Sequence, residues 1–319
     1  MIRFLVRRVL SGVVVLWITT VGVFTLFFVA PHNVAQRIAG RQATQQTVDL
    51  VRARLGLNQP LLHQYWEFVV RLLHGNLGYS YYNSEPVTQL LLSRLSVTLS
   101  VAIGGGILWF VLGVMSGVVS ARRPRSFLDR FITVVALIFY SMPTFLLGIA
   151  LLFVLFFQFH LAGITFFPGS GYVAISSDPL GWAQHMLLPW LTVALTSAGT
   201  YTRLTRTGML EVLSEDYIRT ARSKGVSEGR IIYVHALRSA LSSVVTQFGI
   251  DLGILLGGAV VTETIFGLPG LGQLAILSVT QQDLPVITGV VILGAAFVVV
   301  ANILVDMLYP VLDPRVRLR

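Results

Sequence analysis

Long apolar runs, separated by shorter polar segments, make up most of the chain. Six of these runs are long enough to cross a hydrocarbon core of about 30 Å, and they cover residues 9–30, 97–120, 131–158, 186–202, 242–262 and 286–308. Pro143 lies inside the third run and predicts a kink there, because proline interrupts helical hydrogen bonding. The pattern predicts an all-α polytopic membrane protein with six transmembrane helices.

The first run follows Arg3, Arg7 and Arg8, so it also has the charge order of a secretory signal peptide. A signal peptide has an apolar region of about 7–15 residues before a small-residue cleavage site. The run here is longer and ends in the sequence VAPHN. We therefore expect a retained helix, so that residues 1–30 comprise an N-terminal segment and the first transmembrane helix.

Residues 31–96 are mixed in polarity and predict a small extracytoplasmic helical subdomain. Apolar residues recur at helical spacing after Pro60, namely Leu61, Leu62, Tyr65, Val69, Leu72 and Leu73. His63 and His74 have no cluster of further ligands nearby, so we interpret them as surface or core residues. Residues 97–319 form the third predicted unit, a five-helix transmembrane core.

The polar stretch from Glu211 to Leu241 has the signals of two helices joined by a sharp turn. Ser214 is placed to cap the first helix, Gly225 suits its left-handed end, and Ser227 is a second cap. The charges follow the helix dipole, with acidic residues first and basic residues last, namely Glu215, Asp216, Arg219, Arg222 and Lys224. We predict a rigid cytoplasmic helix over about 215–225; the alternative is a solvated basic loop.

Composition agrees with a membrane protein. The 319 residues are 55% hydrophobic and 12% charged, with a mean hydropathy of +0.77, which excludes an ordinary soluble domain. The chain has no cysteine, so it has neither disulfides nor thiolate metal sites.

The basic residues follow the predicted topology. Most of the 23 arginines and lysines lie at the N-terminus, in the loops after the second and fourth spans, and at the C-terminus. Because basic residues favour the cytoplasmic side, both termini and the 215–225 helix are predicted to be cytoplasmic. The net charge of +9 then needs no nucleic acid to explain it.

Sequence motifs for catalysis are missing. There is no G-x-x-x-x-G-K-[ST] phosphate loop, no H-E-x-x-H and no G-x-S-x-G. The glycine-rich stretch 267–272 follows no predicted strand, so we reject a dinucleotide site. We predict a chain that is not an enzyme, has no ATPase site and holds no cofactor, so active transport would draw its energy from another subunit.

A few residues inside the spans have candidate roles. Ionisable residues are costly in a bilayer, and we take Asp251, Glu263 and Asp306 as candidates for lining a translocation pathway. Small-residue spacing predicts close helix packing at the pair Gly113 and Gly117 and at the stripe Gly249, Gly253 and Gly257. The stripe has two open partners, a helix of the same subunit or one of a second subunit.

Several motifs together resemble a known family. The run Arg219-Thr220-Ala221, followed by Gly225 and by His235-Ala236-Leu237-Arg238, is similar to the EAA loop of ATP-binding-cassette (ABC) importer permeases. It departs from the general loop, where Glu, Ala, Ile and Pro stand in place of Arg219, Thr220, His235 and Arg238. Two further stretches, 54–61 and 75–80, and the residues from Glu263 to Arg315 resemble dipeptide and oligopeptide permeases.

The resemblance implies a role and a set of partners. The 215–225 helix would be the coupling helix that contacts the ATPase, through Glu215, Asp216, Tyr217, Arg219, Thr220, Ala221, Lys224 and Gly225. The implied partners are a second homologous permease, two ABC ATPase subunits or domains that hold ATP and Mg²⁺, and an extracytoplasmic substrate-binding protein. The implied location is the cytoplasmic membrane of a bacterium.

The substrate and two other classes of function stay open. Similar permeases are associated with dipeptides, oligopeptides, glutathione, nickel chelates and haem. A self-sufficient secondary transporter or channel is an alternative, although the spans contain few ionisable residues and no evident inverted repeat. A membrane scaffold without transport is a further alternative.

Overall fold

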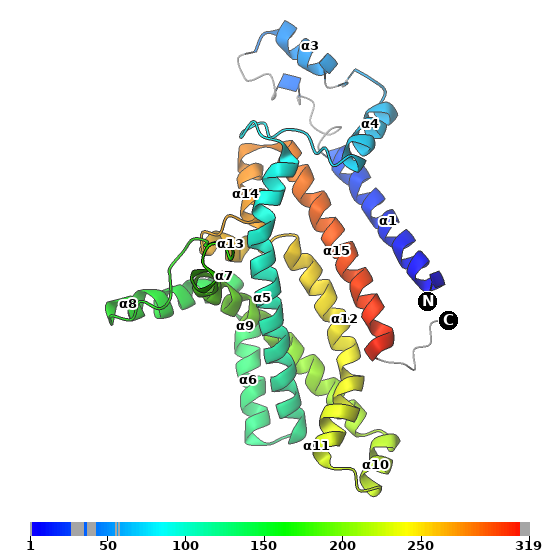
Figure 1. The fold of residues 1–319 in the computed structure, drawn as a ribbon, viewed down its shortest axis with the longest axis vertical. Helices are drawn as coiled ribbons and strands as arrows, with labels where there is room; N and C mark the ends of the chain where they lie inside the picture. Colours follow the sequence, from blue (N-terminus) through cyan, green and yellow to red (C-terminus); the bar gives the residue numbers. More distant parts are fainter. Residues whose placement is uncertain (1, 27–34, 37–42, 55, 57, 313–319) are drawn as a thin grey trace.

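The structure is a computed structural model, and it describes residues 2–26, 35–36, 43–54, 56 and 58–312 (Figure 1). The Asp313 to Arg315 part of the resemblance lies outside the described residues. The regular elements of the described part are all helical, apart from one isolated antiparallel bridge between Tyr79 and Pro86. The predicted all-α class is confirmed.

Five helical segments of the described chain are long and apolar enough to cross a membrane. They correspond to α1 (Ile2–Phe24), α5 (Val87–Arg122), the segment Thr144–Leu161, the segment Glu228–Leu256 and α15 (Leu284–Leu312). The fourth predicted span lies within α9 (Pro179–Leu213), which is less apolar and is not among the five. A count of six transmembrane helices therefore stays a prediction.

The third predicted span is not one kinked helix, and this corrects the sequence analysis. Helix α6 (Phe127–Ser141) ends before Met142, whose ψ of 125° is extended. Proline disfavours the helical conformation in the residue before it, so Pro143 ends one helix and starts another. The chain continues as α7 (Thr144–Leu151), the π-helix η2 (Leu152–Gln158) and α8 (Phe159–Leu161). Figure 1 shows this arm crosswise to α6.

Glycines bring the central helices together. Helix α5 packs along α9, where a Cβ on Gly117 would lie 2.6 Å from the Thr205 Cβ and 2.8 Å from the Thr202 carbonyl oxygen. Gly113, one turn earlier, faces Tyr201 in the same way. The predicted close approach at this glycine pair is confirmed.

The second glycine stripe packs within the chain. Helix α12 (Leu237–Leu256) places Gly253 against Val298 of α15, where an added Cβ would lie 3.0 Å from the Val298 Cα. Gly249 faces Val305 and Gly257 faces Gly294 on the same helix. Of the two partners left open by the sequence, the structure selects a helix of the same subunit.

Two groups of short helices and loops lie at opposite ends of the molecule (Figure 1). One end holds α3 (Gln45–Arg54) and α4 (Leu61–Leu73), which starts after Pro60 as predicted. The other end holds the α5–α6 turn, α10 (Asp216–Ser223) and α11 (Glu228–Arg230), which leads through the π-helix η3 (Ile231–Ala236) into α12. Two short helices, α13 (Val260–Ile265) and α14 (Leu271–Gln281), complete the chain before α15.

Candidate coupling site

Helix α10 ends in a Schellman motif, as its glycine predicts. Gly225 has a φ of +76°. Its N–H donates to the Arg222 carbonyl oxygen at 3.0 Å, and the Val226 N–H donates to the Ala221 carbonyl oxygen at 3.1 Å. No atom lies within 4 Å of the place of a Cβ on Gly225, so backbone conformation alone requires glycine there. The predicted left-handed stop is confirmed.

The predicted cap at the start of this helix is wrong. The N-cap residue is Glu215, which makes no side-chain cap bond. Ser214 remains in the right-handed helical region at the end of α9, and its Oγ donates to the Glu211 carbonyl oxygen at 2.7 Å. Because α9 continues to Leu213, Ser214 is the C-cap residue of α9 and not the N-cap residue of α10. Ser227 is the N-cap residue of α11, also without a side-chain cap bond.

A single apolar residue anchors α10 to the rest of the chain. Ile218 is fully buried, as is Ile231 of η3, the element on which α10 packs. Across the Gly225 turn, Arg222 Nε lies 2.7 Å from Glu228 Oε1, although both side chains are exposed. The sequence analysis did not single out Ile218; its signal is an apolar position within an otherwise polar helix.

The outer face of α10 is exposed within the part of the chain that the structure describes. Of the predicted ATPase-contact residues, the exposed ones are Glu215, Asp216, Arg219, Thr220, Lys224 and Gly225. Tyr217 and Ala221 are half-buried. Arg219 and Asp216 form an exposed ion pair at 3.2 Å, which contributes about 0–1 kcal/mol. The face is thus charged, helical and accessible.

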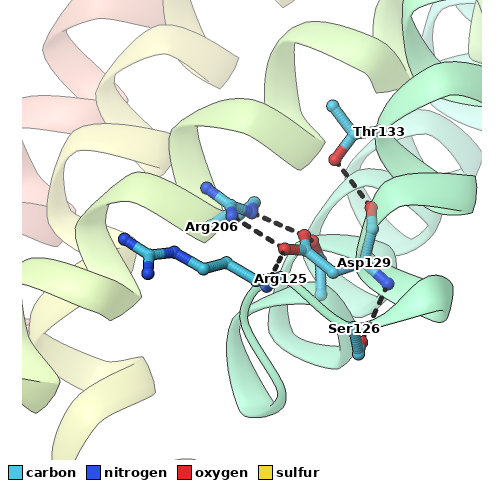
Figure 2. A network of polar contacts seen from close by, with 6 residues as sticks. Arg125, Ser126, Asp129, Thr133 and Arg206 are labelled. Atoms are coloured by element: carbon cyan, nitrogen blue, oxygen red, sulfur yellow. Dashed lines mark hydrogen bonds and ion pairs between the residues drawn. The ribbon is translucent and has the colours of Figure 1, made fainter.

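An ion pair between the buried Asp129 and the half-buried Arg206 holds α9 against the α5–α6 turn (Figure 2). Arg206 donates from Nε and Nη2 to the two carboxylate oxygens of Asp129, at 2.7 and 2.9 Å. The Arg125 N–H donates to Oδ2 at 2.8 Å, and Ser120 Oγ also donates to this carboxylate. Asp129 itself is only 4% exposed. The network fixes the end of α9 that leads directly into α10.

This network lowers the pKa of Asp129. The residue lies at the α5–α6 turn, outside the membrane-spanning segments. The hydrogen bonds from Arg206 hold the pKa of the Asp129 carboxyl well below its usual range, against the opposing effect of burial. The sequence analysis missed the pair, because Asp129 and Arg206 are far apart in sequence and only the fold brings them together.

The acidic residues chosen as pathway candidates lie in different surroundings. Asp251 is half-buried and accepts hydrogen bonds from Tyr201 Oη at 2.7 Å and Gln247 Nε2 at 2.9 Å. Glu263 is fully buried, and it accepts from Thr98 Oγ1 at 2.7 Å and the Gln273 N–H at 2.9 Å. Asp306 belongs to α15, and its side chain lies outside the described part.

Two family models match the chain. Residues 111–318 match the family described as "Binding-protein-dependent transport system inner membrane component". The chain belongs to this family. Residues 1–102 match the model for the N-terminal part of such membrane components. The suspected resemblance is confirmed, and the permease is a membrane-embedded subunit of the ABC importer type, whose members work with ATPases and binding proteins.

Relatives match this permease over almost its whole length. One, from Brucella abortus (strain 2308), is provisionally named a peptide transport system permease protein; it is 42% identical over 318 residues, 99% of each chain. The glutathione transport system permease protein GsiC of Escherichia coli (strain K12) is 36% identical over 317 residues, again 99% of each. Membership in this family favours an importer subunit over a self-sufficient transporter, a channel or a scaffold.

The fold also matches a solved structure. A chain of the MetNI methionine ABC transporter in an inward-facing conformation superposes with a TM-score of 0.57 at 22% identity. The match covers 72% of the permease and 99% of the MetNI chain. At this identity, the likeness concerns the fold alone.

Proposed function

We propose that this permease carries peptides across the cytoplasmic membrane of a bacterium by alternating access, driven by ATP hydrolysis on partner subunits. The observation that carries the proposal is the 42% identity, over 99% of both chains, to a relative named for peptide transport. Family membership supports the importer mechanism. The permease itself contributes no ATPase site and no cofactor; ATP and Mg²⁺ belong to the partners.

The ATPase contact in this proposal is the outer face of α10. Its support is local: the helix is short and closed by a rigid turn, and Ile218 holds it while its charged face stays accessible. A helix held in this way moves as one body with η3 and α12. The partners we propose are a second homologous permease, two ATPase subunits or domains and an extracytoplasmic binding protein.

The proposed orientation places α10 and the α5–α6 turn in the cytoplasm, together with both termini. Its support is the grouping of these two basic segments at one end of the molecule, opposite α3 and α4 (Figure 1). The subdomain 31–96 then lies on the outer side, where a binding protein docks. The bilayer surrounds the remaining core.

Of the three acidic candidates, Asp251 is the one that we propose first as a residue lining the translocation pathway. Its carboxylate is half-buried and lies within the apolar segment Glu228–Leu256, beside Tyr201 of α9. Glu263 is enclosed between α5, α13 and α14, so a pathway role for Glu263 requires these helices to separate during the cycle. For Asp306, the proposed pathway role rests on the sequence alone.

Glutathione is the second substrate candidate. The 36% identity to the Escherichia coli glutathione permease over 99% of both chains favours it. Glutathione is itself a small peptide with free carboxylates, so the two candidates share a recognition chemistry.

Uptake by the complete transporter tests the proposal. The permease is reconstituted in liposomes with its second permease, ATPases and binding protein, and ATP-dependent uptake of labelled di- and oligopeptides is compared with that of glutathione. We expect uptake of a peptide only with ATP and binding protein present. Uptake that a solute gradient drives through this chain alone would contradict the importer mechanism.

A further inference from the structure

Two arginines one turn apart on α9 differ in their surroundings. Arg206 is bound by Asp129 through two hydrogen bonds. Arg203 is exposed, and no carboxylate of the described residues pairs with it. Its guanidinium lies over the ring of Tyr140, with Cζ 5.7 Å from the ring centroid. Arg203 therefore has a positive charge that no carboxylate in the described part of the chain neutralises.

Arg203 lines a groove between α6 and α9. The groove has a volume of about 320 Å³, and Tyr140 of α6 and Thr207 of α9 border it with their hydroxyl groups. Thr133 and Thr202 also line it, but their hydroxyl groups already donate to the backbone. Arg206 closes one side, with its charge already satisfied by Asp129. A cation beside hydroxyl donors is a setting that binds an anion such as a carboxylate.

The groove lies away from the end of the molecule that carries α10. Arg203 precedes the end of α9 at Leu213 by about 15 Å, at about 1.5 Å per residue. Side chains on a helix point back towards its N-terminus, and Arg203 does so, because it reaches Tyr140 near the end of α6. The guanidinium thus points away from the end that carries α10.

Helix α9 is not among the five segments apolar enough to cross a membrane, and an arginine without a carboxylate partner is unfavourable against lipid. Charged residues within membrane segments face a protein interior or a water-filled cavity, because a bilayer does not solvate them. Helix α9 is also unusually polar, since hydroxyl residues recur along its second half at Thr196, Ser197, Thr200, Thr202, Thr205 and Thr207. Both observations favour water, rather than lipid, in front of Arg203.

We infer that Arg203 lines the translocation pathway and takes the carboxylate of the transported substrate. The inference rests on the proposed peptide transport, and it names the chemical group that the pathway recognises. Thr207, one turn further along α9, borders the same groove. Arg206 is a positioning residue, since it is held by Asp129 and keeps α6 and α9 together at the base of the groove.

The water in front of Arg203 can be tested without a substrate. Because the permease has no cysteine, Arg203→Cys introduces one thiol into the chain, and a charged, membrane-impermeant thiosulfonate reports whether water reaches it. The assembled transporter is labelled in lipid nanodiscs and the permease is isolated for mass measurement. The control is Ile149→Cys on α7, which is also exposed and lies in an apolar segment.

We expect rapid labelling of Arg203→Cys and slow labelling of Ile149→Cys. No labelling of Arg203→Cys would overturn the inference, because lipid or the second permease would then cover the groove. This result does not depend on what the transporter carries, so it separates a failure of this inference from a failure of peptide transport.

Carboxylate recognition is tested by comparing each peptide with its C-terminal amide. In reconstituted transporter, we expect Arg203→Gln to lower uptake of the free-acid peptide about tenfold, the effect of losing one charge-assisted hydrogen bond, and to leave uptake of the amide nearly unchanged. Arg130→Gln, an exposed arginine of α6 outside the groove, is the control. An equal loss for both peptides, or no loss, would overturn the assignment; absence of all peptide uptake by the unmodified transporter would refute peptide transport instead.

Discussion

The α5–α9 pair and α10 approach the same end of the molecule, but different contacts hold them. Helices α5 and α9 touch through glycines, with almost no free space between them, and the Asp129–Arg206 pair joins them to α6. Helix α10 has one buried anchor, Ile218, and an outer face of exposed charges. The first region is built to stay rigid, and the second to be contacted. Changes in the first should remove folded protein, whereas changes in the second should leave the protein folded and impair coupling.

The largest effect is expected at Asp129. Asp129→Leu removes both hydrogen bonds from Arg206, whose side chain is 29% exposed, and this costs about 2–3 kcal/mol. Thermal unfolding of the purified permease in detergent should show a large fall in Tm. The double variant Asp129→Leu with Arg206→Met should recover much of the loss, because an apolar pair replaces the ionic one. A double variant as unstable as the single one would contradict the ion-pair account.

The same pair gives a pH dependence with a defined sign. Because Arg206 lowers the pKa of Asp129 in the folded state, the pair stabilises the protein fully above pH of about 4, the ordinary pKa of aspartate. The stabilisation is lost progressively as the pH falls below that value. The measurement is Tm against pH for the natural chain and for the double variant, which should lack this part of the acid sensitivity. Parallel curves for the two proteins would refute the assignment.

A smaller effect is expected at the glycine contact. Gly117→Val places a side chain where a Cβ already lies 2.6 Å from Thr205, so α5 and α9 must move apart, at about 1–3 kcal/mol. The yield of monodisperse permease extracted from membranes measures it. Gly22→Val on α1 is the matched control, since no atom lies within 4 Å of its added Cβ. Equal yields for both variants would argue against tight α5–α9 packing.

Substitutions in α10 should impair the coupling of ATP hydrolysis to transport rather than lower the yield of folded permease. Gly225→Ala forces alanine into a left-handed conformation, at about 1–2 kcal/mol, and so distorts the end of the helix. We expect normal membrane levels but less transport per ATP hydrolysed. Gly225→Asn should be milder, because asparagine tolerates this conformation. Gly229→Ala should be silent, since Gly229 has an ordinary helical φ and open space.

The smallest effect is expected at the ion pair between Arg222 and Glu228. Both side chains are exposed, and such pairs contribute about 0–1 kcal/mol. Glu228→Gln should therefore change neither Tm nor coupling measurably, unless the ATPase itself contacts this residue. A marked loss of coupling with unchanged Tm would extend the proposed contact surface from α10 to α11.

Local signals in the sequence predicted local structure well. Gly225 predicted its own left-handed turn, Pro60 the start of α4, and the spacing of Gly113 and Gly117 a close helix contact. Ser214 failed as a cap because α9 runs further than its apolar part, and Pro143 broke a helix that the apolar run implied was continuous. Asp129 with Arg206 was out of reach, because contacts between distant residues depend on the fold. The same holds for the groove at Arg203, an arginine that the sequence places only in a basic region.

Site-specific photo-crosslinking tests the central claim, that the outer face of α10 contacts the ATPase. A photo-crosslinking residue replaces Thr220, which is exposed in this chain, and the complete transporter is irradiated in nanodiscs. The control position is Leu62, 84% exposed on α4 at the opposite end. We predict a crosslink from position 220 to the ATPase and none from position 62. A crosslink from position 220 to the extracytoplasmic binding protein, or no crosslink to the ATPase, would contradict the account.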